Sequence, residues 1–382
     1  MKKILFYFLF YYAITLSNAQ TIALIPNINS NDFGFSGNAV VFNNALYFLY
    51  NTSGMQQVAR YDGNNIKLIT SPSTGSCLLG PQNVYDKNLC IGLCNKHYKS
   101  QLVFYDGDKS LKWVDNPDLD YDFAGNTIML NNDLYYNYYY GAIRKLAKYN
   151  GTNSIISLPD SISLSNSNKM IIYNNSLYFY CQCYTKGNSK NSYLANYDGT
   201  KIALIKIPNN CCEILEFTIF KDELYLGLSY CSSIKDNELA KVNKDKLMLI
   251  SNPIFPNRSQ FFENSGFYAN FTILNNELYF YYQVPSGKIQ LAKFNGKDIT
   301  LIPNPDNDGK FKGNIINFNN ALYLCYNSKL LKFDGIKYTI ITNPDDAKGL
   351  FGDFVIYNNE LFFDYVNLSG KRQLAKLIEN TK

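Results

Sequence analysis

A single histidine limits the chemistry that this chain can perform. His97 lies in the polar segment Asn95–Tyr98. Ser-His-Asp sites, Cys-His sites and multi-histidine metal sites would all have to be built around this one residue. We therefore interpret His97 as a surface histidine, and we predict no catalytic residue and no cofactor.

Carboxylates keep one enzymatic alternative open. The chain has 31 acidic residues, and glycoside hydrolysis needs only two suitably placed carboxyl groups. Most of the acids recur at the same turn positions from unit to unit, for example Asp62, Asp106, Asp198 and Asp334. This recurrence indicates a structural role in turns rather than a catalytic role. The alternative function is a carbohydrate-active hydrolase or lyase that uses carboxylates near a central channel.

Three alternating acids resemble a calcium loop. Asp118, Asp120 and Asp122 could all present oxygen ligands on one side of the chain. Met129 stands where a closing glutamate would be expected. The surrounding Asn-Pro-Asp motif also recurs at Asn304 and Asn343. A repeated turn is thus the preferred interpretation, with calcium as the weaker one.

Nine cysteines are spread unevenly over the chain. In an exported protein such cysteines are expected to form disulfides. We predict a Cys77–Cys94 bridge, a bridge from Cys211 or Cys212 to Cys231, and a second bridge to Cys183. Cys325 or Cys90 is expected to remain a thiol, and a thiolate zinc site is the alternative.

Aromatic residues in loops are the remaining candidates for binding. Flat rings bury a large area at low entropic cost, which suits sugar or protein recognition. The alternative for each of them is packing between blades, because tyrosine is abundant throughout the chain. The candidate ligand-binding residues are Tyr98, Tyr139, Tyr140, Phe261 and Phe262.

The elements that position these residues come from eight copies of one repeat. Each copy contains a leucine in a short apolar run, and these leucines recur about every 40 to 55 residues, a spacing typical of four-stranded propeller blades. An Asn-Asn pair suits a tight turn between the first two strands, which we term a and b. An Asp-Gly or Asn-Gly pair joins strands c and d. The repeated leucines are Leu46, Leu89, Leu134, Leu177, Leu224, Leu278, Leu322 and Leu361.

The last repeat is incomplete, and the start of the chain can complete it. Asp353–Tyr357, Glu360–Tyr365 and Gln373–Leu377 supply strands a, b and c, while Thr21–Asn27 matches the d strand at Ile299–Asn304. Closing the ring with this N-terminal segment would leave only protected strand edges. The predicted fold class is an all-β, eight-bladed β-propeller, a single domain over residues 20–382.

The first 19 residues have the layout of a secretory signal. Lys2 and Lys3 precede the apolar run Ile4–Leu16, and Ser17–Ala19 provides small residues for cleavage. The run is about 13 residues long, too short to span a membrane. We therefore expect an exported monomer in a periplasm, outside the cell or at its surface. The formal net charge of +5 comes with no basic stripe, so nucleic acid is not an expected partner.

The repeat resembles a known family of secreted bacterial repeats, named after the motif Glu-Leu-Trp-x-x-Asp-Gly-Thr. The clearest matches are Tyr193–Thr200 and Ser369–Lys376. The motif tryptophan is replaced by alanine in most units, and kelch repeats are a more distant analogue. The resemblance implies a secreted or surface propeller and assigns no catalytic residues.

The sequence therefore favours a non-enzymatic binding scaffold for a protein or a glycan. The tight turns a–b and c–d must lie on one side of the ring, so the b–c and d–a connections share the other side. These connections vary most between units, and binding residues tend to lie on variable loops carried by a rigid scaffold.

Overall fold

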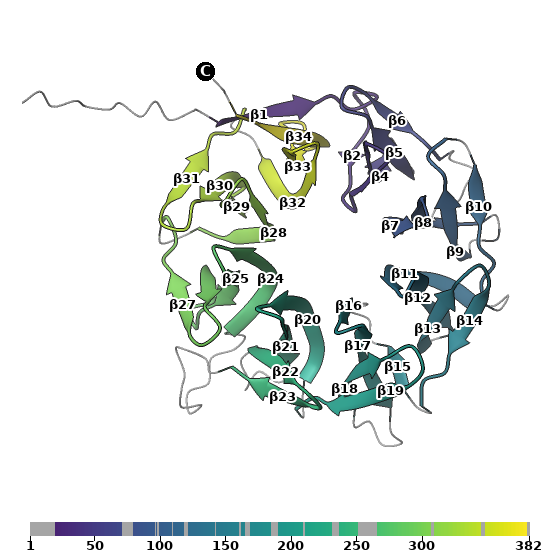
Figure 1. Cartoon of the computed structure of the whole chain (residues 1–382). Coiled ribbons are helices and arrows are strands. Elements are labelled where there is room, and N and C mark those ends of the chain that lie inside the picture. Colours follow the sequence, from purple (N-terminus) through teal and green to yellow (C-terminus); the bar gives the residue numbers. More distant parts are fainter. Residues whose placement is uncertain are drawn as a thin grey trace, which may run out of the picture.

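Eight antiparallel sheets make up the described part of the chain. The structure, a computed structural model, describes residues 20–70, 79–95, 97, 99–108, 110–117, 121–141, 143–159, 162–164, 169–184, 190–208, 211–230, 237–250, 266–306, 309–344 and 348–379. The sheets are arranged as blades around a ring, with strand a innermost and strand d outermost (Figure 1). The predicted eight-bladed β-propeller is confirmed.

The first four blades follow the chain from residue 34 to residue 206. Blade 1 contains β2 (Gly34–Phe35), β3 (Val40–Phe42), β4 (Ala45–Asn51), β5 (Gln56–Tyr61) and β6 (Ile66–Leu68). Blade 2 contains β7 (Gly80–Tyr85), β8 (Asn88–Cys94), β9 (Ser100–Tyr105) and β10 (Leu111–Trp113). Blade 3 contains β11 (Tyr121–Leu130), β12 (Asp133–Tyr140), β13 (Ile143–Tyr149) and β14 (Asn153–Ile156). Blade 4 contains β15 (Ile162–Leu164), β16 (Met170–Tyr173), β17 (Ser176–Tyr184), β18 (Lys190–Tyr197) and β19 (Ile202–Lys206).

The other four blades complete the ring. Blade 5 contains β20 (Cys211–Phe220), β21 (Glu223–Tyr230), β22 (Glu238–Asn243) and β23 (Lys246–Leu249). Blade 6 contains β24 (Gly266–Leu274), β25 (Glu277–Gln283), β26 (Ile289–Phe294) and β27 (Ile299–Ile302). Blade 7 contains β28 (Phe311–Phe318), β29 (Ala321–Tyr326), β30 (Lys329–Phe333) and β31 (Tyr338–Ile341). Blade 8 contains β32 (Gly349–Tyr357), β33 (Glu360–Val366), β34 (Arg372–Glu379) and the N-terminal strand β1 (Gln20–Ile25).

The N-terminal strand closes the ring as predicted. β1 pairs with β34 in an antiparallel register that sets Gln20 opposite Glu379 and Ile25 opposite Leu374. Ile22 and Ile25 are buried in two different core clusters, one shared with blade 7 and one with blade 1. β1 therefore fills the outer edge of blade 8 and anchors this blade to both neighbours.

The turns between strands a and b take the predicted left-handed conformation. Asn43 and Asn44 have φ of 44° and 53°, and the other five Asn-Asn pairs are similar. Asparagine tolerates this region because its short polar side chain bonds locally. Blades 2 and 5 make the same turn with Asp86-Lys87 and Lys221-Asp222.

The core lies between neighbouring blades, where strands b and c of one blade pack on those of the next. All eight repeated leucines are fully buried. The cluster between blades 1 and 2 contains Tyr47, Leu89 and Val103. Tyr47 packs edge-on against Tyr105 with ring centroids 5.9 Å apart. Most of the tyrosines thus serve packing, which was the alternative considered for the aromatic candidates.

The inner strands differ from the predicted ones because each is interrupted. In blade 8 the register shifts between Leu350 and Phe354, so β32 starts before the predicted Asp353. In blade 1 the inner strand is split into β2 and β3. A bulge adds a residue without ending the strand, so the alternation of buried and exposed residues is broken there. An alternating pattern in the sequence therefore does not include the residues before the bulge. The described residues contain no helix long and apolar enough to cross a membrane.

Candidate functional site

In every blade, one residue of the inner segment lies five residues before the a–b turn and therefore at a similar level of the channel wall. We call these eight residues the belt. Four of them are asparagines, one is a proline and three are charged, so the charged members mark where the repeat has diverged. The belt consists of Asn38, Pro81, Asn126, Lys169, Glu216, Asn270, Asn314 and Asp353.

The belt lies at the interruptions of the inner strands. Asn38, Asn126 and Asn270 have positive φ of 50°, 48° and 66°. Register shifts fall at this level in blades 3, 6, 7 and 8. Bulges bend a strand and redirect its side chains, and they are common near functional sites.

Several belt residues bond to the neighbouring blade. Asn38 Nδ2 donates to the carbonyl of Leu79 at 3.0 Å, and the Asn126 N–H donates to Gln82 Oε1 at 2.9 Å. Asn270 Nδ2 donates to the carbonyl of Gly313 at 2.5 Å. Part of the belt is thus structural, because these bonds join adjacent inner strands.

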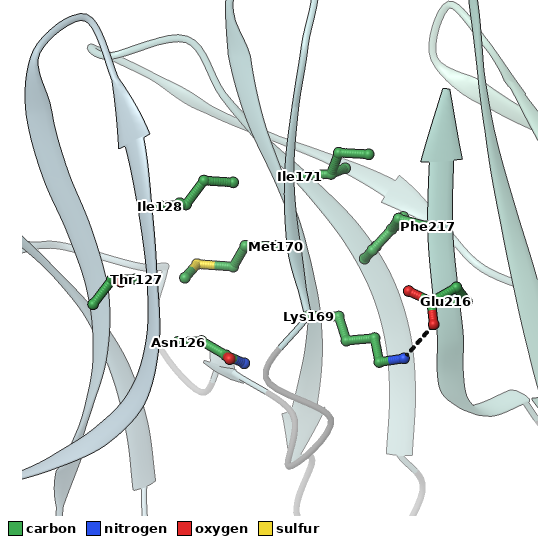
Figure 2. A pocket seen from close by; sticks show the side chains of 8 residues that line it. All are labelled: Asn126, Thr127, Ile128, Lys169, Met170, Ile171, Glu216 and Phe217. Carbon is green, nitrogen blue, oxygen red and sulfur yellow. Dashed lines mark hydrogen bonds and ion pairs between the residues drawn. The ribbon is translucent and has the colours of Figure 1, made fainter. Parts of the chain in front are cut away.

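A first channel cavity of about 250 Å³ is formed by blades 3, 4 and 5. Figure 2 shows Asn126, Thr127 and Ile128 on one side, Met170 and Ile171 in the middle, and Glu216 and Phe217 on the other. Lys169 Nζ lies 2.8 Å from Glu216 Oε2, so the two side chains form an ion pair and neutralise each other. Both side chains are partly exposed, and such ion pairs contribute about 0 to 1 kcal/mol to stability.

A second channel cavity of about 270 Å³ lies where blades 7, 8 and 1 meet. Its wall combines polar belt residues with aromatic and small side chains. The charged belt residue here is Asp353, whose side chain is 44% exposed. The lining residues are Phe35, Ser36, Gly37, Asn38, Ala39, Asn314, Asp353, Phe354 and Val355.

A buried carboxylate holds Asp353 in place. Asp364 Oδ1 accepts the N–H groups of Gly352 at 2.9 Å and of Asp353 at 3.0 Å. Asp364 Oδ2 accepts Arg372 Nη2 at 2.5 Å, and the same nitrogen lies 3.4 Å from Asp353 Oδ2. Burial raises the pKa of Asp364, while the Asp353 N–H and Arg372 act against this rise. Asp364 is fully buried and is therefore a positioning residue.

Four exposed aromatic rings lie at the end of the blades that carries the b–c and d–a connections, here called the loop face. Phe33 and Phe351 are 56% and 55% exposed, and Tyr140 and Tyr268 are 46% and 44% exposed. The strand register places them there: Tyr140 is the last residue of β12, and Phe351 follows Leu350, which pairs with Tyr365 near the end of β33. Arg372 packs 4.7 Å from the centroid of the Phe351 ring.

The two candidate tyrosines that the structure describes lie at the predicted end of β12. Arg144 packs 4.5 Å from the centroid of the Tyr139 ring and bonds its hydroxyl, while Lys145 Nζ lies 4.7 Å from the Tyr140 centroid. Tyr139 is therefore partly covered, and Tyr140 is the more exposed ring. The other three candidates, Tyr98, Phe261 and Phe262, lie outside the described residues.

The segment that resembles a calcium loop is described only at its last acid. Asp122 Oδ1 accepts the N–H of Ser100 at 2.9 Å, which joins blade 3 to blade 2. Asp118 and Asp120 lie outside the described residues. In the described ranges no three His, Cys, Asp or Glu residues are placed to hold a metal ion. The backbone N–H of His97 donates to Asn95 Oδ1, and the residue is exposed as expected.

The cysteines differ in part from the predicted pairing. Cys183 and Cys211 are free thiols, so the structure lacks the bridges predicted for these two residues. The reason is their placement: Cys211 is buried between blades 4 and 5, whereas Cys183 packs on the cluster between blades 3 and 4. Burial raises the pKa of Cys211 to about 11. Cys90 and Cys325 are buried free thiols, as expected.

The remaining predicted pairs stay predictions. Cys77, the predicted partner of Cys94, lies outside the described residues. Cys231 and the side chain of Cys212 also lie outside the described part of the structure.

Sequence reasoning missed the belt and the most exposed aromatic rings. A signal for the belt was present, since Gly-Asn or Gly-Asp precedes the a–b turn at a fixed distance at Gly37, Gly125, Gly313 and Gly352. Phe33, Tyr268 and Phe351 carried no such signal. Each lies within two residues of a buried hydrophobic residue, and only the register decides which one points outward.

Comparisons with known proteins identify the fold and no family. No protein-family model and no curated protein matches the sequence. A puromycin-hydrolysing peptidase of Mycobacterium tuberculosis is 8% identical with a TM-score of 0.51, and covers 91% of this chain and 52% of its own. A prolyl endopeptidase structure is 11% identical with a TM-score of 0.50, with 92% and 51% covered. A streptogramin B lyase structure is 15% identical with a TM-score of 0.47, with 81% and 95% covered.

These likenesses concern the propeller alone. The chain spans about half the length of the two peptidases. Identities of this size carry no catalytic residue over to this chain, because one fold supports many functions.

Proposed function

We propose that the protein is an exported, non-enzymatic scaffold that binds a protein or a glycan through its loop face. The observation that carries this proposal is the set of exposed aromatic rings there, Phe33, Tyr140, Tyr268 and Phe351. Large rings bury much area with few rotatable bonds, so they supply a disproportionate share of binding energy.

Two cationic contacts support this use of the rings. Arg372 packs on Phe351 and Lys145 packs on Tyr140, which orients each ring while leaving about half of it exposed. A ring held in advance loses less freedom on binding. The apolar side chains of Met55, Ile143 and Leu368, which are 46%, 45% and 69% exposed, extend the same face.

The face opposite the loop face consists of tight a–b and c–d turns. Its a–b turns repeat one left-handed geometry, and its c–d turns are closed by their own Asp or Asn side chains, as in Asp334 Oδ1 with the N–H of Lys337 at 2.8 Å. Ile336 is 91% exposed on such a turn. Ile336 is therefore a suitable control for exposed apolar area away from the loop face.

Export is part of the proposal. Removal of residues 1–19 would leave Gln20, the first residue of β1, at the N-terminus and keep the closing strand intact. An oxidising destination would also permit the Cys77–Cys94 bridge. N-terminal sequencing of protein recovered from the medium or periplasm should begin at Gln20. A full-length product confined to the cytosol would contradict export.

A second candidate function is a carbohydrate-active hydrolase or lyase, favoured by one observation. Asp353 opens into the second channel cavity. Glycosidases need two carboxyl groups that both reach the substrate, whereas the neighbouring Asp364 is fully buried beneath Arg372. Turnover of any glycan by the wild type, with loss in Asp353→Asn, would favour this candidate over the binding scaffold.

The binding proposal is tested on a glycan array and by capture of partner proteins from the source medium. Tyr140→Ala, Phe33→Ala and Phe351→Ala should each weaken binding of an identified partner about tenfold or more, since central aromatic contacts are commonly worth over 1 kcal/mol. Ile336→Ala and Trp113→Ala, in a c–d turn and in the outer strand β10, should leave it unchanged. Equal effects of both sets would contradict the placement.

A further inference from the structure

We propose that the second channel cavity binds one neutral sugar unit of a glycan, with Asn314 and Asp353 bonding its hydroxyl groups. This inference goes beyond the proposed loop-face function, because it names a separate site in the channel and the ligand class of that site. The cavity is formed by three blades and has a volume of about 270 Å³, which suits a ligand of a few hundred Å³ at most.

The polar groups of the cavity are available to a ligand. The exposed side-chain amide of Asn314 has no hydrogen-bond partner among the described residues. Asp353 has one long contact to Arg372, at 3.4 Å, and remains 44% exposed. An amide and a carboxylate together offer donors and acceptors, which is what the hydroxyl groups of a sugar require.

The cavity also has an apolar side. Phe354 is partly buried and lines the cavity next to Asp353. A sugar ring has hydroxyl groups at its edge and C–H groups on its faces, so it matches a wall with polar groups beside an aromatic ring.

The local charge disfavours anionic ligands. Asp353 and Asp364 surround the single cation Arg372, which leaves an excess of negative charge that repels an anion. A divalent cation would need more oxygen ligands than this pair, and the described residues contain no group of three such side chains. A neutral, hydroxyl-rich molecule meets neither obstacle and matches the donors and acceptors of Asn314 and Asp353.

The site is fixed before any ligand arrives. Asp364 holds the N–H groups of Gly352 and Asp353, and this sets the direction of the Asp353 side chain. Gly37 lies opposite with φ of +92°, and a Cβ there would come within 3.1 Å of Asp353 Oδ2. Glycine therefore keeps the space beside the carboxylate open. The first channel cavity differs, because Lys169 and Glu216 neutralise each other.

The test uses the mature chain with glucose, galactose, mannose, N-acetylglucosamine and their neutral trisaccharides. Binding is measured by calorimetry and ligand-observed NMR. Asn314→Ala and Asp353→Asn should each weaken binding about tenfold, the loss expected for one ligand hydrogen bond. Asn126→Ala, at the same belt position in blade 3, should bind as the wild type does. Thermal unfolding checks that each variant is folded.

Unchanged affinity in Asn314→Ala and Asp353→Asn, or loss of affinity in Asn126→Ala, would overturn the assignment of the site. Binding of acidic sugars alone would overturn the ligand class. If no neutral sugar binds while Tyr140→Ala releases a captured protein, this inference fails and the proposed loop-face function stands. If sugars bind at the cavity while every loop-face variant binds normally, the inference stands and the loop-face proposal fails.

Discussion

The buried carboxylate of Asp364 stabilises the fold and also holds the wall of the second cavity. It is fully buried in β33 and bonds two backbone N–H groups and Arg372. Asp364→Ala should lower the free energy of unfolding by about 3 kcal/mol, because it leaves a partly buried guanidinium without its main partner. Urea unfolding measures this change.

The matched control lies in the same strand. Glu360 forms an ion pair with Lys376 at 2.8 Å, and its side chain is 41% exposed. Glu360→Ala should change stability by less than about 1 kcal/mol. Equal losses for the two variants would show that the burial of Asp364 is irrelevant to stability.

The Asp-Gly turns predict how stability depends on pH. In Asp62, Asp198 and Asp334 the carboxylate accepts backbone N–H groups three and two residues further on, and Thr200 Oγ1 adds a bond to Asp198, which lowers each pKa. Since the folded pKa is below the unfolded value of about 3.9, the stabilisation is present above that pH and is lost as pH falls through the folded pKa.

The chain contains its own control for this effect. Asn295 makes the same two bonds, both at 2.8 Å, with a side chain that does not titrate. The triple variant Asp62→Asn, Asp198→Asn, Asp334→Asn should keep its stability at pH 7 and lose less of it between pH 5 and pH 2. Thermal unfolding across that range measures the difference. A pH profile identical to that of the wild type would contradict the account.

Strand β1 determines whether the ring is closed. Ile22 is buried against a cluster that includes Phe318 of blade 7 and Leu361 of blade 8. Ile22→Ala should cost about 2 to 4 kcal/mol, as other large-to-small core substitutions do. The neighbouring Thr21→Ala is exposed and should cost less than about 0.5 kcal/mol. Chemical unfolding of both variants tests closure, and a harmless Ile22→Ala would argue against it.

The elements were predictable where the repeat dictates local geometry. Asn-Asn pairs indicated left-handed turns, and the resemblance of Thr21–Asn27 to a d strand indicated closure; both are confirmed. The belt was not predicted, because a bulge changes the direction of side chains and its partners lie in another blade. Asn270, for example, bonds Gly313 more than 40 residues away. The Gly-Asn and Gly-Asp pairs mark belt positions in the sequence but do not indicate these contacts between blades.

The two faces of the ring differ: one carries structural turns, and the other carries the residues proposed to bind a partner. One face repeats tight turns, while the other carries the exposed aromatic rings and the variable connections. Blade-to-blade packing and belt hydrogen bonds make the ring a rigid carrier. A rigid carrier with variable loops is an arrangement typical of binding proteins.

Hydroxyl-radical footprinting of the mature chain, with and without its captured partner or glycan, tests the loop-face proposal most directly. Bound ligand should reduce oxidation of Phe33, Tyr140 and Phe351, which are about half exposed in the free protein. Ile336 and Trp113 should be oxidised equally in both states. Protection of Ile336 and Trp113 with none at the three rings would contradict recognition through the loop face.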